Sequence, residues 1–420
     1  MNEETEFLSD LQCAYYLGRN KKMPLGGVSC HVYIETDGML EDIPRLQKSW
    51  SQLIKMHPAL RRKYLPNGTS KWADKIHDQV KIRDLTKMRE GEVKMELNLL
   101  RNSLSHRLMK IEEGEVISLQ VSKLPGKRTR MHFDMDLIAA DVRSFQIILR
   151  DLARLYSGEK LTIFQTEKEY AHWEKAQTED RNGDKADMLY WKGKTAGIVA
   201  EAPVKIKMEP EGLSCSSYDA VSVFIEPDTW AFIKKEVEKI RIDIECFLAA
   251  ALGKVLAKQK GMKKILLNMP VFKRTHNENL VGDYNKLLMF LVDTETGESK
   301  REYYYAVGQL FREDMRHLEF DGIKIQKLIA RNNPGKKWIA PVVFSPSLDI
   351  ELGDKTYRDC FGEMTYMISQ TPQVWLDVQA FETCGKLWIS WVFPEGLMDC
   401  EAVKMMADDY KSQIIDIAMQ

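Results

Sequence analysis

Residues 191–217 interrupt a pattern that otherwise repeats in the two halves of the chain. Pro203 and Pro210 lie within this segment, and prolines in such a setting end helices and strands. On either side, segments with strand character alternate with segments of helical periodicity. The chain has 420 residues, more than one hydrophobic core usually holds. We therefore expect two α/β lobes, residues 1–190 and 218–420, connected by 191–217.

The spacing of apolar residues predicts the individual elements of both halves. Helical spacing predicts helices at 42–57, 90–110, 143–157, 244–258, 300–317, 323–331 and 400–418. Strand character is found at 28–36, 115–123, 129–137, 221–225, 340–349, 364–369, 373–381 and 386–393. Strands and helices thus occur in both halves, as expected for two lobes of similar α/β architecture.

Composition excludes several classes of protein. The net charge is −1, so nothing indicates a nucleic-acid partner. No run approaches the roughly 18 apolar residues of a membrane span, and the acidic start of the chain is unlike a signal peptide. The seven cysteines form no C-x-x-C pair and the eight histidines no H-E-x-x-H motif. We therefore expect no metal site, and reduced thiols in a cytoplasmic protein.

The segment D-L-I-A-A-D-V-R-S, from Asp136 to Ser144, lies where a predicted strand gives way to a predicted helix. Asp136 and Asp141 at such a junction have two interpretations. They are turn and helix-capping residues, which is the common role of aspartate before a helix, or they belong to a functional site. The spacing alone leaves both open.

The same nine residues fit D-x-x-x-x-D-x-x-S, and the chain resembles the heterocyclization domains of nonribosomal peptide synthetases, within the condensation-domain superfamily. Ordinary condensation domains carry H-H-x-x-x-D-G at this place, and no paired histidines precede Asp141. Further segments that resemble the family's motifs are 8–19 (L-S-D-L-Q-C-A-Y-Y-L-G-R), 57–61 (H-P-A-L-R), 190–191 (Y-W), 270–274 (P-V-F-K-R), 281–284 (V-G-D-Y), 341–345 (P-V-V-F-S), 369–379 (S-Q-T-P-Q-V-W-L-D-V-Q) and 393–397 (F-P-E-G-L).

The resemblance implies a fold of two chloramphenicol-acetyltransferase-like lobes, arranged as a V with a central tunnel. It also implies an activity in two steps. A carrier-bound acyl or peptidyl thioester condenses with carrier-bound Cys, Ser or Thr, and cyclodehydration then gives a thiazoline or oxazoline. No bound cofactor is expected, because the substrates arrive on the phosphopantetheine arms of carrier proteins. The expected partners are upstream and downstream peptidyl carriers and other synthetase modules, and the initial Met favours a free-standing protein.

Asp377 is the candidate acid/base for cyclodehydration, a role implied by the resemblance. Strand alternation places Asp377 and Gln379 on the same side as Trp375, although an exposed strand aspartate would show the same pattern. Ser345 takes the place of a family threonine whose hydroxyl assists this step, and Pro346 follows where the family has serine. Gln379 is expected to donate a hydrogen bond to Asp377 or to a substrate carbonyl, or to be structural.

Asp136, Asp141 and Ser144 of the motif are expected to be mainly structural. In the superfamily the aspartate that matches Asp141 pairs with an arginine of the other half, here Arg274. A buried carboxylate is rarely tolerated without such a partner. A general-base role for Asp136 and Asp141 remains the alternative.

Several positions depart from the family pattern. Lys273 replaces asparagine, Asn285 and Lys286 replace threonine and serine, Val378 replaces histidine, and Val392 replaces aspartate. Lys273 and Asn285 are candidates for lining the tunnel, where a lysine would alter its charge. These departures leave amide condensation without cyclization, or a divergent substrate, as alternatives. A non-catalytic scaffold that binds carriers is a separate hypothesis. The retained polar site residues argue against the scaffold.

Overall fold

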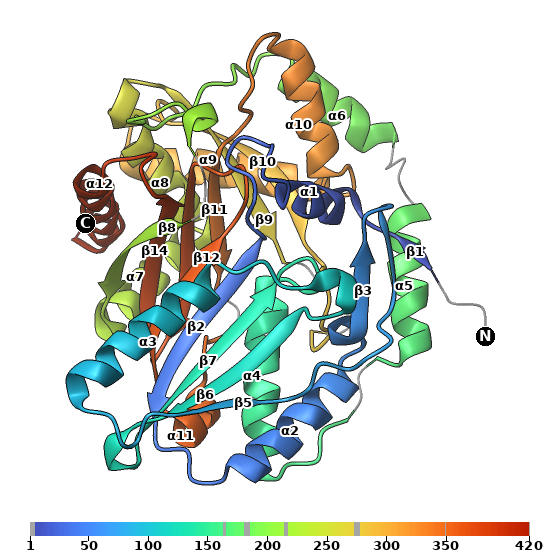
Figure 1. The fold of residues 1–420 in the computed structure, drawn as a ribbon. Coiled ribbons are helices and arrows are strands. Elements are labelled where there is room, and N and C mark those ends of the chain that lie inside the picture. Colours follow the sequence, from blue (N-terminus) through green and yellow to red (C-terminus); the bar gives the residue numbers. More distant parts are fainter. Residues whose placement is uncertain are drawn as a thin grey trace. The chain divides into compact units, whose positions relative to one another are not determined.

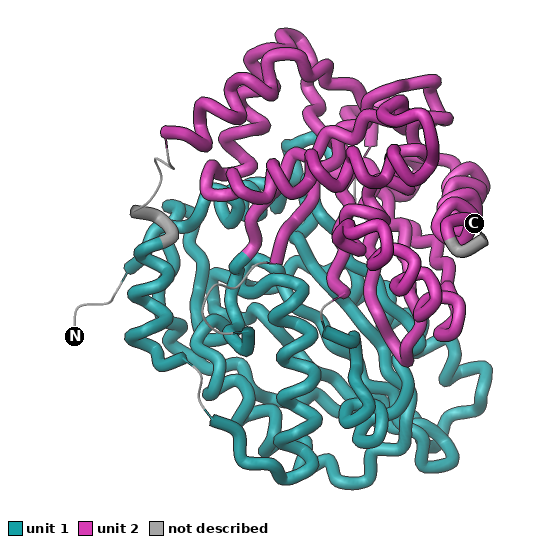
Figure 2. Tube along the Cα trace, turned by 180° about the vertical axis from the view of Figure 1, so that it is seen from behind, with its two compact units in different colours: residues 1–180, 274–284, 350–372 teal, residues 181–273, 285–349, 373–420 magenta. Residues whose placement is uncertain are grey.

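The computed structural model divides into two compact units, each assembled from three stretches of the chain (Figure 2). Unit 1 comprises residues 1–180, 274–284 and 350–372, and unit 2 comprises 181–273, 285–349 and 373–420. The structure describes residues 5–162, 165–179, 185–213, 217–272, 278–348 and 350–419. The lobe bounds expected at 190 and 217 stay a prediction, because compactness alone does not define a lobe.

A five-stranded sheet in the order β12-β2-β7-β6-β5 forms the centre of unit 1 (Figure 1). Its strands are β2 (His31–Gly38), β5 (Lys81–Asp84), β6 (Ile117–Lys123), β7 (Thr129–Asp136) and β12 (Glu363–Gln370). β2 pairs antiparallel with both β7 and β12, and β5 is parallel to β6. A strand from late in the chain therefore completes the sheet of the first half.

The two faces of this sheet differ in chemistry. On one face, Phe133 packs against Trp50 of α2 and against Tyr357 of α11. On the other, fully buried polar residues include Tyr33 and Glu35 of β2. The helices that flank the sheet are α2 (Ile43–Met56), α3 (Glu90–Ser105), α4 (Val142–Ser157) and α11 (Lys355–Phe361). Unit 1 also contains α1 (Asp10–Gly18), α5 (Glu167–Glu179) and a small sheet of β1 (Glu6–Phe7), β4 (Thr69–Trp72) and β3 (Arg62–Leu65).

Buried ion pairs make the polar face compatible with a folded core. Arg101 of α3 donates to both carboxylate oxygens of Glu35, at 2.8 and 2.5 Å. Arg130 of β7 adds a third contact to Glu35 at 2.9 Å, and the Tyr33 hydroxyl a fourth at 2.7 Å. Burial opposes the ionisation of Glu35, yet these hydrogen bonds lower its pKa below the ordinary range. The carboxylate is thus held ionised inside the unit.

The sheet of unit 2 has six strands in the order β10-β9-β11-β13-β14-β8. Its strands are β8 (Tyr218–Ile225), β9 (Lys264–Val271), β10 (Lys286–Asp293), β11 (Val342–Ser347), β13 (Leu376–Thr383) and β14 (Lys386–Pro394). β11 runs parallel to β9 and β13, and the other neighbours are antiparallel. The helices are α6 (Lys185–Thr195), α7 (Pro227–Lys239), α8 (Ile244–Lys260), α9 (Lys300–Arg316), α10 (Gly322–Asn332) and α12 (Cys400–Ile415).

Helices cover the face of the unit 2 sheet that carries Trp391. Its ring lies 5.8 Å from that of Tyr410 of α12, and the Tyr410 hydroxyl donates to the carbonyl of Leu248 in α8 at 2.9 Å. Successive side chains of a strand point to opposite faces. Ser390 and Val392, the neighbours of Trp391, therefore lie on the face away from these helices.

Each predicted element is present, with differences at its ends, but several observed elements were not predicted, among them strands β9 and β10 and helices α1, α5, α6, α7 and α11. The helix expected at 90–110 ends at Ser105, and the strand expected from 373 begins at Leu376. Gln373 has a φ of 63°, a left-handed conformation that does not belong to a strand. α6 continues to Thr195, so the segment expected to be irregular from 191 begins with a helical turn.

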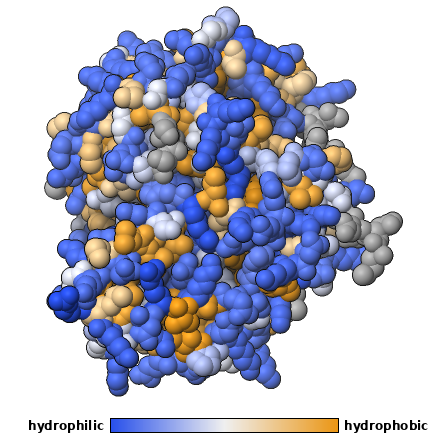
Figure 3. Space-filling model, viewed as in Figure 1, coloured by the Kyte–Doolittle hydropathy of each residue, from blue (hydrophilic) through white to orange (hydrophobic). Residues whose placement is uncertain are grey.

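Apolar side chains are scattered over the face of the molecule shown in Figure 3, which is mainly hydrophilic. Exposed apolar residues of unit 1 include Met95 and Leu99 of α3 and Ile82 of β5. Single exposed apolar residues are normal on protein surfaces and indicate no particular partner. Among the described residues, no helix is both long and apolar enough to cross a membrane.

Candidate active site

Three side chains predicted as site residues meet on one face of the unit 2 sheet. Ser345 of β11 donates from Oγ to Oδ1 of Asp377 at 3.0 Å. Gln379 donates from Nε2 to Oδ2 of Asp377 at 2.8 Å. β11 and β13 are parallel neighbours in which Ser345 pairs with Gln379, and Asp377 and Gln379 lie two residues apart on β13. The structure therefore brings these three residues together.

Burial controls the protonation of Asp377. The residue is 5% exposed, and its cross-strand partners are Val343 of β11 and Val392 of β14. Burial raises the pKa of Asp377 to about 6, while the hydrogen bonds from Gln379 and Ser345 oppose the rise. A carboxyl group with such a pKa is populated in both forms near neutral pH, so it can accept and donate protons.

Pro346 does not displace the Ser345 hydroxyl. β11 keeps its register with β13 from Val342 to Ser347, and Pro346 pairs with Ala380 within that ladder. The proline found where the family pattern has serine therefore leaves the contact between Ser345 and Asp377 in place.

Asp136 and Asp141 serve local structure in unit 1. Asp136, the last residue of β7, lies 2.5 Å from Nη1 of Arg19 and accepts from the backbone N–H of Ile138 at 3.1 Å. Burial raises the pKa of Asp136, although the charge of Arg19 opposes this. Asp141 is the N-cap of α4 and accepts from the N–H of Ser144 at 2.7 Å.

Ser144 connects the start of α4 to the segment around Gly282 by two hydrogen bonds. Its hydroxyl donates to the carbonyl of Gly282 at 2.9 Å and accepts from the N–H of the same residue at 3.0 Å. Asp141 contributes as well, because its Oδ2 accepts from the N–H of Tyr284 at 3.2 Å. The capping interpretation of the motif is thus observed directly in these contacts.

The remaining predicted residues are Lys273, Arg274 and Asn285. Lys273 and Arg274 lie outside the described residues, so the pair between Asp141 and Arg274 stays a prediction. Asn285 is partly buried and directly precedes β10. β9 and β11 separate β10 from β13, which carries Asp377.

Arg19 ends the first motif of the sequence, and the sequence alone assigned it no role. It binds Asp136 and also the carbonyl of Met109, and Gln12 of the same motif donates to the carbonyl of Ile138 at 2.9 Å. The contact between Arg19 and Asp136 could have been predicted from two signals: an arginine ends one motif, and an aspartate that becomes buried begins another. The opening motif therefore holds the loop between β7 and α4.

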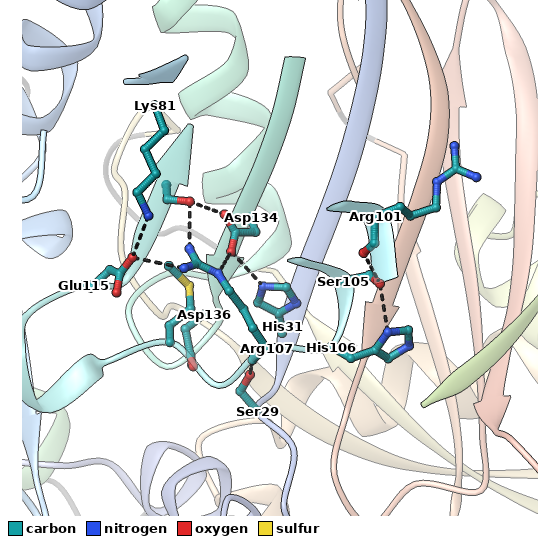
Figure 4. Close-up of polar contacts among 12 residues, drawn as sticks. Ser29, His31, Lys81, Arg101, Ser105, His106, Arg107, Glu115, Asp134 and Asp136 are labelled. Carbon is teal, nitrogen blue, oxygen red and sulfur yellow. Dashed lines mark hydrogen bonds and ion pairs between the residues drawn. The ribbon is translucent and has the colours of Figure 1, made fainter. Parts of the chain in front are cut away.

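A second polar cluster in unit 1 extends from buried His31 toward the surface (Figure 4). Nε2 of His31 lies 3.5 Å from Oδ2 of Asp134, which also binds Arg107. Arg107 reaches Glu115 at 3.1 Å, and Lys81 lies 4.0 Å from Glu115. Burial opposes ionisation of Asp134, but His31 and Arg107 lower its pKa below the ordinary range. The cluster is a compensated set of charges that sequence reasoning did not predict.

Comparison with known proteins identifies the family. A family model described as the condensation domain matches residues 6–420. The chain belongs to the condensation-domain family. This condensation domain is 30% identical over 413 residues to phenyloxazoline synthase MbtB of Mycolicibacterium paratuberculosis, covering 93% of the chain and 34% of that protein. It is 25% identical over 406 residues to pyochelin synthetase PchE of Pseudomonas aeruginosa, covering 93% of the chain and 28% of that protein.

The condensation domain thus spans about a third or less of the length of these relatives. Among solved structures, it is similar to the cyclization-docking bidomain of the EpoB nonribosomal peptide synthetase from Sorangium cellulosum. The TM-score is 0.89 at 24% identity, covering 99% of this chain and 85% of that one. This likeness confirms the predicted fold class, two chloramphenicol-acetyltransferase-like lobes.

Proposed function

We propose that the chain catalyses heterocyclization in nonribosomal peptide synthesis, with Asp377 as the group that moves protons. The observation that carries the proposal is the buried Asp377 carboxyl, whose pKa is about 6 and which Ser345 and Gln379 hold by hydrogen bonds. The similarity to a phenyloxazoline synthase and to a pyochelin synthetase supports the reaction class.

The first step, amide formation, depends mainly on positioning, because a thioester is already activated toward an amine. Ring closure then requires proton transfer. The side-chain thiol or hydroxyl adds to the new amide carbonyl, and its proton passes through Asp377 to the former carbonyl oxygen. This gives a cyclic adduct that carries a hydroxyl group, and Asp377 returns to its starting form.

Dehydration completes the ring. The hydroxyl group leaves as water with a proton from Asp377, the N–H proton of the adduct returns to Asp377, and a C=N bond forms. Asp377 must therefore donate and accept within one cycle, which suits a pKa near the working pH. Ser345 and Gln379 keep its two oxygens oriented between these transfers.

The substrates are proposed to arrive on phosphopantetheine arms of upstream and downstream peptidyl carriers, within a synthetase that has other modules. Membership of the condensation-domain family supports this delivery. No cofactor of the chain's own is required. In amide formation the acceptor amine takes the acyl group and the thiol of the upstream phosphopantetheine arm leaves with the amine proton, and ring closure and dehydration then need only proton transfers. A cytoplasmic location remains part of the proposal.

Condensation without cyclization is the second candidate. Val392 lies directly opposite Asp377, at a position where the family pattern has aspartate, so the surroundings of the carboxyl differ from that pattern. Val378, by contrast, pairs with Trp391 on the helix-covered face and is fully buried, so its replacement of histidine lies away from Asp377. Only the first of these departures favours the alternative.

Incubation of the chain with an acyl-loaded carrier and a carrier loaded with Cys, Ser or Thr tests the proposal, with products read by mass. A product that has lost one further water relative to the amide supports heterocyclization. An amide that persists with all three amino acids indicates condensation alone. Absence of any new product, with both carriers correctly loaded, indicates a scaffold.

A further inference from the structure

Asp377 lies between two valines on its face of the unit 2 sheet. Val343 of β11 pairs with it on one side and Val392 of β14 on the other. Paired side chains of neighbouring strands share a face, and Val343 and Val392 are only 7% and 2% exposed. The walls beside the proposed proton-transfer group are therefore aliphatic.

The next neighbours of Asp377 on these strands carry no charge either. Two residues along from the valines, on the same face, lie Ser345 of β11 and Ser390 of β14. The influences on the pKa of Asp377 are burial and the hydrogen bonds from Gln379 and Ser345, with no charged side chain among them. Among the residues that the structure describes, Asp377 therefore acts as a lone carboxyl.

A lone carboxyl of this kind takes a proton from a thiol far more readily than from a hydroxyl. A cysteine thiol has a pKa of about 8.5, and water, which serves as the model for a hydroxyl, has a pKa of about 15.7. Because the pKa of Asp377 is about 6, the thiol lies roughly 2.5 pKa units above it and the hydroxyl more than about 9 units above it. Proton transfer in the transition state becomes less effective as this gap widens, so the base is matched to a thiol.

The surroundings of Asp377 also suit sulfur better than oxygen. A hydroxyl that leaves water needs hydrogen-bond partners, whereas a thiol behaves as a small apolar group. Val343 and Val392 offer no side-chain hydrogen bond. Both oxygens of Asp377 already accept one, from Ser345 and Gln379. A substrate thiol between the two valines therefore loses less on leaving water than a hydroxyl does.

We infer that the acceptor amino acid is cysteine, so that the ring formed is a thiazoline, and that Val392 determines this specificity. The inference rests on the proposed function, because it concerns the nucleophile that Asp377 can activate. Val392 is singled out because the family pattern has aspartate at this position, where a second carboxyl would lie directly opposite Asp377.

Ring closure with cysteine needs proton transfers alone. The thiol proton passes to Asp377 as the C–S bond forms, and the former carbonyl oxygen takes a proton from Asp377. The resulting hydroxyl group then leaves as water with a proton from Asp377, the C=N bond forms, and the N–H proton returns to Asp377. No oxidant or reductant takes part.

Carriers loaded with ready-made amides allow ring closure to be measured without amide formation. The downstream carrier is loaded with N-benzoyl-Cys, N-benzoyl-Ser or N-benzoyl-Thr and incubated with the full chain, and the loss of one water is followed by mass. For each substrate, the rate with the wild type is divided by the rate with Asp377→Asn, which removes the intrinsic difference between thiol and hydroxyl.

The ratio should be about 10²–10⁴ for Cys, the usual contribution of acid–base catalysis, and less than about 10 for Ser and Thr. Ser is smaller than Cys, so steric exclusion would not explain a low ratio with Ser.

Variants at position 392 test the residue assigned to this specificity. Val392→Asp places a second carboxyl opposite Asp377, and two carboxylates that share a site raise the pKa of one of them, which makes it a stronger base. Ring closure with Ser should then become at least about tenfold faster than in the wild type, as expected for one pKa unit. Val392→Asn is the matched control, similar in shape and polarity but uncharged, and should show no such gain.

A ratio for Ser or Thr within about tenfold of that for Cys would overturn the inference, and this comparison needs only the wild type and Asp377→Asn. In that case the specificity fails while the proposed function stands. Equal gains in Val392→Asn and Val392→Asp would overturn the role of Val392. If the wild type closes no ring with any of the three substrates, the proposed function fails and the inference fails with it.

Discussion

Oγ of Ser345 lies 3.0 Å from Oδ1 of Asp377, across two parallel strands that are neighbours in the unit 2 sheet. Because a hydrogen bond from a hydroxyl favours the ionised carboxylate, Ser345 opposes the effect of burial on Asp377. The contact therefore sets how readily the carboxyl changes its protonation state, which is the property that ring closure requires.

Removal of this hydroxyl should raise the pKa of Asp377 above about 6. Ser345→Ala loses a donor to the ionised form, so the protonated form persists to higher pH. The basic limb of the cyclization profile should move up by roughly half to one unit, as expected for one hydrogen bond. Ser345→Thr keeps the hydroxyl and serves as the control. A pH profile of Ser345→Ala identical to that of the wild type would contradict the assigned contact.

The elevated pKa of Asp377 also predicts a dependence of stability on pH. The folded protein binds this proton more tightly than the unfolded chain, so the penalty of ionising Asp377 appears as pH rises from 3.8 and is complete above about 6. Asp377→Asn removes the penalty, which corresponds to at most about 3 kcal/mol. Urea unfolding should show Asn gaining stability over Asp at about pH 8 relative to about pH 5. An equal difference at both pH values would argue against a buried, perturbed carboxyl.

The pair of Arg19 and Asp136 predicts a large structural effect far from Asp377 in sequence. Arg19→Ala leaves the buried Asp136 without its cation, which should cost roughly 3 kcal/mol in the free energy of unfolding. Asp136→Asn in the same chain removes the unpaired charge and should recover part of the loss. Denaturant unfolding of the two single variants and the double variant measures the coupling. Strictly additive losses would show that the two side chains do not interact.

Variants of Asp141 and Arg274 distinguish the capping role of Asp141 from its predicted ion pair with Arg274. Asp141→Ala removes the N-cap of α4, which alone costs about 0.5–2 kcal/mol. If Arg274 is also its partner, Arg274→Ala should be destabilising by roughly 3–5 kcal/mol. Asp141→Ser keeps a capping oxygen without the charge and separates the two contributions. A fully stable Arg274→Ala protein would remove the ion pair from the account.

The contacts of Asp377 show what the sequence could predict. Strand alternation alone places Asp377 and Gln379 on one face, and the family motif points to Ser345 as a third member. Ser345 lies alongside Gln379 because of the register between two parallel strands. This register depends on contacts between distant parts of the chain, so the spacing of residues within either strand does not predict it.

The unit 1 sheet shows where local pattern fails. Glu35 and Asp134 alternate with apolar residues, which normally indicates one solvent-exposed face. Both are fully buried, because arginines from other elements neutralise them. β12 pairs with β2 although more than 300 residues separate them in the chain, and no spacing within either segment specifies such a partner. Compensation of charge and pairing of distant strands were therefore not predicted from the sequence, and neither were whole elements such as β9 and β10 of the unit 2 sheet.

A single-turnover comparison of wild type and Asp377→Asn tests the central claim most directly. Both proteins receive the same acyl-loaded and aminoacyl-loaded carriers, and amide and ring products are followed by mass over time. Loss of the proton-transfer group should slow ring closure by about 10²–10⁴-fold while amide formation continues, so the variant accumulates a product one water heavier. Ring closure by Asp377→Asn at the wild-type rate would contradict the account.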